Sequence, residues 1–156
     1  MNARPMTLLD TVHALTEAPR PDLSAPRVED ALDVALRGDP DNKNRFLFVM
    51  RSFRAAPPIA SVELRLPLRG ARRKGPLCIL ELDPAAAPAA AEVSQVFGAP
   101  ASLLAPRGRS TPSGEAFFVY ERPWGALRFG ATTPLPSRDG TRERPILTAI
   151  VIDIER

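Results

Sequence analysis

The segment that decides the fold is Ile59-Ala-Ser-Val-Glu-Leu-Arg-Leu-Pro-Leu68, in which apolar and polar residues alternate. Side chains two positions apart in a strand point to the same face, so this pattern predicts a half-buried β-strand. One face would carry Ala60, Val62, Leu64, Leu66 and Leu68, and the other Ser61, Glu63 and Arg65.

Two further apolar segments flank this strand. Asn44–Arg54 has apolar side chains at positions of both parities, which predicts a strand buried on both faces. Leu77–Leu82 is a short apolar strand. The turn that leads to it, Arg69-Gly-Ala-Arg-Arg-Lys-Gly75, is basic and bracketed by glycines, as in a β-hairpin.

Three helices are predicted, each from its end signals. They are Thr7–Glu17 with a capping box of Thr7 and Asp10, Ala25–Arg37 between Ser24 and Gly38, and a helix that Asp83-Pro84 opens and Gly98 closes. Further strands are predicted over residues 101–105, 116–122, 126–132 and 146–155.

The order of these elements predicts the fold class. Only one helix lies between predicted strands, which disfavours parallel βαβ units. We therefore expect an α+β protein, a single domain over residues 1–156 with a mainly antiparallel sheet and helices packed on one face. Residues 1–24 would be an N-terminal helix and proline-rich linker, and 25–156 the core. Each half reads as a helix followed by strands, which leaves an internal duplication open.

Composition limits the classes of function. The 156 residues are 44% hydrophobic, and no apolar run reaches the length of a membrane span or resembles a signal peptide. We therefore expect a cytoplasmic protein that has no membrane as a partner. The 21 basic residues exceed the 18 acidic ones by only three, and the Arg, Ala and Pro content is typical of a GC-rich bacterial genome. This small excess of charge is weak support for a nucleic-acid ligand.

Candidate catalytic groups are few. The single histidine, His13, lies in the first helix, and the single cysteine, Cys78, lies inside an apolar strand. The carboxylates of Asp153 and Glu155 lie on a strand where arginines could pair with them. No motif of a metal site or a phosphate-binding loop is present, so we expect no enzyme, no cofactor and no metal. A small enzyme built on a carboxylate or Cys78 is the alternative.

Arginine-rich loops are the best candidates for binding. We expect a partner-binding surface made of the hairpin residues Arg69, Arg72, Arg73 and Lys74, of Arg107, Arg109, Arg138 and Arg142 in two other loops, and of Trp124 in a turn. The loops would form one basic face if they shared one end of the sheet. The alternatives are a solvated hairpin tip that protects a sheet edge, and a tryptophan that folds back on the sheet.

The order of features over residues 92–156 resembles small bacterial α+β modules. The segment holds Glu92-Val-Ser-Gln-Val-Phe-Gly-Ala-Pro100, Phe117-Phe-Val-Tyr120, Gly125-Ala-Leu-Arg-Phe-Gly130 and Leu147-Thr-Ala-Ile-Val-Ile-Asp-Ile154. It is similar to modules of the SmpA/BamE and beta-lactamase-inhibitory-protein type and to toxin-immunity proteins, including those of type VI secretion. The resemblance implies binding of a partner through a sheet face or its loops, without catalysis. The chain lacks a lipobox cysteine and is basic, unlike some of those proteins.

Together these features predict a non-enzymatic protein-binding domain. The most concrete form is an immunity or inhibitor-like protein that binds an acidic surface of a cognate bacterial effector and blocks it. The alternative is a nucleic-acid-binding accessory protein that uses the basic hairpin at 69–74.

Overall fold

The computed structural model describes residues 6–104, 115–132 and 145–155. Within these ranges the chain forms one eight-stranded antiparallel sheet and three helices, which is an α+β arrangement. The helices are α1 (Leu8–Thr16), α2 (Ala25–Leu32) and α3 (Ala91–Phe97). The strands are β1 (Ala35–Gly38), β2 (Leu47–Arg54), β3 (Ile59–Pro67), β4 (Leu77–Leu82), β5 (Ser102–Leu104), β6 (Glu115–Arg122), β7 (Gly125–Thr132) and β8 (Leu147–Ile154).

The sheet consists of two meanders that meet at its centre. Its order is β1-β2-β3-β4-β8-β7-β6-β5, so each meander has four consecutive strands, and α2 or α3 precedes it in the chain. The central strands β4 and β8 are antiparallel, with Leu77 opposite Asp153 and Glu81 opposite Ala149. The beginning of β4 therefore lies beside the end of β8.

Two rows of apolar side chains cross the four central strands and form the core. The rows follow from the strand register: Val62, Leu80, Ile150 and Phe129 in one, and Leu64, Cys78, Ile152 and Leu127 in the other. All eight residues are buried and belong to one cluster with apolar residues of the helices. The alternation that predicted β3 therefore marks the face of the sheet that packs against the helices.

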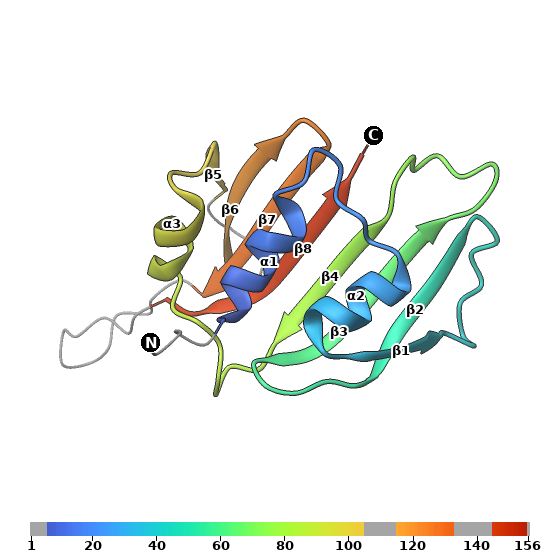
Figure 1. The fold of residues 1–156 in the computed structure, drawn as a ribbon, viewed down its shortest axis with the longest axis horizontal. Coiled ribbons are helices and arrows are strands. Elements are labelled where there is room, and N and C mark those ends of the chain that lie inside the picture. Colours follow the sequence, from blue (N-terminus) through green and yellow to red (C-terminus); the bar gives the residue numbers. More distant parts are fainter. Residues whose placement is uncertain (1–5, 105–114, 133–144, 156) are drawn as a thin grey trace.

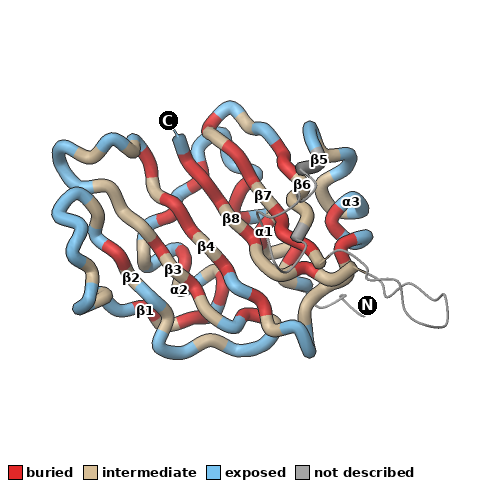
Figure 2. The backbone as a smooth tube through the Cα atoms, turned by 180° about the vertical axis from the view of Figure 1, so that it is seen from behind, coloured by how far each residue is buried: buried red, intermediate tan, exposed pale blue. Residues whose placement is uncertain are grey.

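Figure 1 shows α1 and α2 in front of the sheet and α3 beside β5 and β6. Seen from behind, the strands β2, β3, β4 and β8 lie toward the viewer (Figure 2). The second face carries Arg51, Glu63, Ile79, Val151 and Arg128 in one row across the register. None of the three described helices has the length and apolarity that a membrane span needs.

The first predicted helix is confirmed, including its capping box. Thr7 Oγ1 accepts a hydrogen bond from the Asp10 N–H, and Asp10 Oδ2 accepts one from the Thr7 N–H. The second predicted helix is wrong in its last turn. It ends at Leu32, because Asp33 takes a left-handed conformation (φ 52°) and residues 35–38 pair with β2 as an edge strand. The apolar spacing of these residues fits both a helix and a strand, and pairing with β2 favours the strand.

Two further predictions are wrong in part. Asp83 does not cap a helix: its Oδ1 accepts from the Ala85 N–H in a turn, and α3 begins only at Ala91. The strand predicted over Asn44–Arg54 begins at Leu47 and is not buried on both faces, since Phe48 is 44% and Phe53 57% exposed. Phe48 pairs with Leu66 on the helix face of the sheet, beyond the part that the helices cover, whereas Phe53 shares the parity of Arg51 on the second face.

Candidate interaction surface

Cys78 and His13 occupy places that suit packing. Cys78 is fully buried, and burial raises the pKa of its thiol to about 12, so little reactive thiolate forms near neutral pH. The His13 ring lies edge-on against Phe97, with ring centroids 5.4 Å apart. Across the described ranges, no three His, Cys, Asp or Glu side chains gather as metal ligands would.

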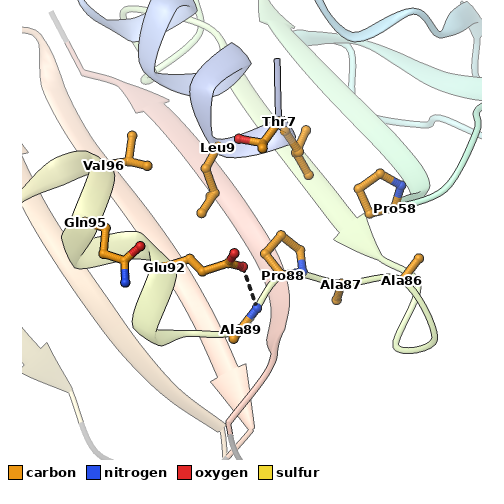
Figure 3. A pocket seen from close by; sticks show the side chains of 11 residues that line it. Thr7, Leu9, Pro58, Ala86, Ala87, Pro88, Ala89, Glu92, Gln95 and Val96 are labelled. Atoms are coloured by element: carbon orange, nitrogen blue, oxygen red, sulfur yellow. Dashed lines mark hydrogen bonds between the residues drawn. The ribbon is translucent and has the colours of Figure 1, made fainter. Parts of the chain in front are cut away.

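A cavity of about 380 Å³ lies between α1, the loop before α3, and α3 (Figure 3). Its walls are mostly small or apolar, including Leu9, Pro58, Pro88 and Val96. The carboxylate at its rim, Glu92, accepts a hydrogen bond from the Ala89 N–H at 3.0 Å. Glu92 therefore has a structural role at the start of α3.

The charged residues named above on the second face of the sheet are paired with described carboxylates or arginines. Near β1, Arg51 contacts Asp39 at 2.9 Å and Glu63 at 2.6 Å, and Arg65 contacts Glu63 at 2.7 Å. The hydrogen bond from Arg51 lowers the pKa of Asp39. Further along the sheet, Arg128 Nη1 contacts Asp153 Oδ2 at 3.0 Å. These arginines already have carboxylate partners.

Arg73 of the β3–β4 hairpin belongs to the same kind of network. Its Nη1 donates to Asp153 Oδ1 at 2.7 Å and to the Gly75 carbonyl at 3.3 Å. Burial alone would raise the pKa of Asp153, but the hydrogen bonds from Arg73 and Arg128 outweigh it, so the pKa is lowered. The ion pair fixes the hairpin to the end of β8. Arg73 is thus a positioning residue, and its charge is already neutralised.

The remaining hairpin cations are different. Arg69, Arg72 and Lys74 are exposed, and none of them forms an ion pair with a described residue. Arg45, on the neighbouring loop, lies over the Phe46 ring with its guanidinium carbon 4.8 Å from the ring centroid. This end of the sheet therefore carries cations that the described part of the chain does not neutralise.

Exposed apolar side chains lie among these cations. Phe46 is 39%, Phe48 44% and Leu68 47% exposed. Phe46 and Leu68 are neighbours, because the Leu68 N–H donates to the Phe46 carbonyl at 2.8 Å. Phe48 follows two positions later on the same side of β2. We define the hairpin-end surface as Arg45, Phe46, Phe48, Leu68, Arg69, Arg72 and Lys74.

A cleft of about 440 Å³ borders this surface and shares Phe46 and Arg72 with it. Asn44, Phe46 and Leu47 form one wall, and Gly70, Arg72 and Arg73 form the other. The Phe46 ring contacts the position that a Cβ of Gly70 would occupy, so the two loops touch at the base of the cleft.

Among the described residues that the sequence grouped as one binding surface, the structure leaves some exposed and gives others a partner or a place in the core. Arg69, Arg72 and Lys74 lie on the hairpin as expected, while Arg73 is occupied by Asp153. Trp124 is only 4% exposed and belongs to the core, which agrees with the alternative of a tryptophan that folds back on the sheet, so its ring is not offered to a partner. Its turn lies beside the end of β8, where the Glu155 N–H donates to the Trp124 carbonyl.

The other predicted arginines, Arg107, Arg109, Arg138 and Arg142, lie outside the described residues. The strand ends that flank their two loops can nevertheless be located. Thr132 pairs with Glu115, and Leu147 begins β8. Because β4 and β8 are antiparallel, this end of the sheet is opposite to the hairpin end.

The sequence analysis missed Phe46, Phe48 and Leu68 as surface residues. Their apolar character and β-strand spacing predicted burial, and only the position of the helices leaves them exposed. One indication of this exposure was present in the sequence, where Phe46 follows Arg45 directly after a polar turn. No family model, curated protein or solved structure matches the chain. The resemblance of residues 92–156 to inhibitor modules therefore stays a prediction.

Proposed function

We propose that this protein is a non-enzymatic protein-binding domain that recognises an acidic partner through the hairpin-end surface. The observation that carries the proposal is the combination of exposed Phe46, Phe48 and Leu68 with cations that have no described carboxylate partner. Aromatic residues and arginine are enriched in the centres of protein interfaces, and contiguous exposed apolar side chains mark such sites. The paired arginines of the sheet face offer much less to a partner.

The form of binding that we propose is inhibition. A rigid surface at the end of a sheet can cover the active site of an effector by shape and charge alone. This would make the chain an immunity or inhibitor-like protein of a bacterium. The same proposal includes a cytoplasmic location and a role in type VI secretion. It also includes a single domain over residues 1–156 with helices on one face of the sheet.

Binding of single-stranded nucleic acid is the second candidate. Cations beside an exposed aromatic ring are also the elements of a stacking platform. However, the Arg45 guanidinium already lies over the Phe46 ring, and Phe48 and Leu68 extend the apolar area without adding a charged groove. We therefore favour a protein partner.

Affinity purification tests the proposal with a matched pair of charge reversals. Tagged wild-type protein is compared with Arg72→Glu/Lys74→Glu and with the control Arg20→Glu/Arg54→Glu, in nuclease-treated extract of the source organism. All four residues are exposed and form no ion pair with a described residue, so both variants should fold. We expect one stoichiometric protein on the wild type and the control, and its loss from the Arg72/Lys74 variant.

The purified partner then tests inhibition directly. Its activity, or its toxicity on expression in a host, should fall when this protein is added at equal concentration. Recovery of the same proteins on all three baits would contradict the proposed surface. Recovery that vanishes with nuclease would support the nucleic-acid candidate instead.

A further inference from the structure

The hairpin-end cleft has the shape and chemistry of a site for one acidic side chain of a partner. We infer, on the basis of the proposed function, that the partner presents a segment in which an aspartate or glutamate lies beside a large apolar residue. The carboxylate enters the cleft and pairs with Arg72, while the apolar side chain packs on Phe46, Phe48 and Leu68.

The walls of the cleft are held in place by interactions within the chain. Asn44 Oδ1 accepts from the Phe46 N–H at 2.9 Å, and the Leu68 N–H joins the two loops through the Phe46 carbonyl. The Ala71 N–H donates to the Leu68 carbonyl at 3.0 Å, which closes the turn. Arg73 fixes the far side of the hairpin to Asp153. A partner therefore meets a site that needs little ordering on binding, and this favours affinity.

The charges of the cleft select a carboxylate. The described lining residues include two guanidinium groups and no carboxylate. Arg73 is neutralised by Asp153, whereas Arg72 is exposed and forms no ion pair with a described residue. A guanidinium presents a planar pair of donors that matches the two oxygens of a carboxylate. Arg72 is thus the group that would bind the acidic side chain.

The apolar side of the surface requires a second contact. A lone carboxylate would leave Phe46, Phe48 and Leu68 in water, and the pairing of exposed charges contributes little by itself. An apolar residue beside the acidic one would cover these side chains and lower the local polarity around the ion pair. The two contacts therefore strengthen each other.

Charge complementarity also argues against a second copy of this chain as the occupant. An isologous contact through this surface would bring Arg69, Arg72 and Lys74 of one copy against the same cations of the other. Like charges placed together oppose association. A second copy of the chain would create this repulsion, whereas an acidic segment of a partner would be attracted to the same cations.

Peptide selection tests the inference. A random peptide library displayed on phage is panned against the immobilised full-length protein, and the enriched peptides are synthesised for fluorescence anisotropy at moderate salt. We expect enriched sequences that contain Asp or Glu next to an aromatic residue or leucine. Their affinity should fall by about tenfold or more with Arg72→Glu and with Phe46→Ala.

Two matched variants control for general effects of charge and of an exposed ring. Arg54→Glu and Phe53→Ala change the same residue types at the other end of β2, where Phe53 is 57% exposed. Both should bind the selected peptides as the wild type does. Arg72→Lys keeps the charge but loses the planar pair of donors, so an intermediate loss of affinity is expected.

Several results would overturn the inference. These are selected peptides without acidic residues, equal binding by Arg72→Glu and Arg54→Glu, or no selected peptide at all. Preferential binding of a single-stranded oligonucleotide, or self-association that Phe46→Ala abolishes in sedimentation, would also overturn it. If affinity purification still yields a protein partner whose binding survives Arg72→Glu and Phe46→Ala, the protein-binding function stands and only this site is wrong. If neither peptide nor partner binds, both proposals fail.

Discussion

Replacing Asp153 by asparagine should destabilise the protein and loosen the hairpin that carries the proposed surface. The Asp153 side chain is only 9% exposed, and its two oxygens accept hydrogen bonds from Arg73 at 2.7 Å and Arg128 at 3.0 Å. Arg73 belongs to the hairpin and Asp153 to β8, 80 positions apart, so this contact joins distant parts of the chain.

The magnitude follows from these contacts. A hydrogen bond to a charged group contributes about 1.5–3 kcal/mol, so the two bonds set an upper limit of roughly 3–6 kcal/mol. Both arginines are partly exposed, at 26% and 34%, and can regain water when the carboxylate is lost. The asparagine oxygen also keeps one acceptor. We therefore expect a loss of about 2 kcal/mol in the free energy of unfolding, or about 4–8 °C in Tm.

The single tryptophan provides the assay. Trp124 is buried beside the end of β8, so its fluorescence in a urea titration reports on this region. Glu155→Gln is the control, because Glu155 is 56% exposed and lies 3.9 Å from Arg128, and it should change stability by less than about 0.5 kcal/mol. Equal stability of Asp153→Asn and wild type, or an equal loss in Glu155→Gln, would refute the reasoning.

Three further predictions concern Asp153, Cys78 and Gly125. The pKa of Asp153 is lowered in the folded state, so its carboxylate stabilises the fold fully above about pH 4, and this stabilisation is lost as the pH falls through the lowered pKa. In urea titrations at stepped pH, the free energy of unfolding should therefore fall less on acidification in Asp153→Asn than in the wild type. Cys78, with a pKa of about 12, should resist a thiol reagent at about pH 8 until the protein is unfolded, and rapid labelling of the native state would contradict its burial. Gly125→Ala should cost at least about 2 kcal/mol in unfolding free energy, since φ is +153° and a Cβ would clash with the Asp153 carbonyl, whereas Gly98→Ala, whose Cβ meets nothing, should cost less.

Local sequence patterns predicted most of the elements. The alternation over residues 59–68, the capping box of Thr7 and Asp10, and the glycine-bracketed turn at 69–75 each depend on residues close together in the chain. The capping box, the turn and the alternation between Val62 and Leu66 were confirmed because short-range geometry decides them, whereas Ala60 and Leu68 at the ends of the alternation are exposed. The segment after Leu32 was predicted wrongly because its apolar spacing fits both a helix and a strand, and only pairing with β2 distinguishes the two.

The candidate site was predictable only in part. The basic residues of the hairpin were visible in the sequence, but the role of Arg73 was not, because its partner Asp153 is 80 positions away. The exposure of Phe46 reverses what its residue type and position suggested, and for Trp124 the structure selects the alternative in which the ring folds back on the sheet. Neither follows from local pattern, since both depend on which parts of the sheet the helices cover.

The sequence by itself determined an antiparallel α+β protein with a basic hairpin between two apolar strands. Those features arise from side-chain periodicity and turn chemistry, which act over a few residues. The tertiary structure decided which end of the sheet carries the hairpin, which arginines are neutralised, and which aromatic rings remain in water. The order β4-β8 at the centre and the placement of α1 and α2 control these outcomes, because strand pairing and helix packing join residues that are distant in the chain.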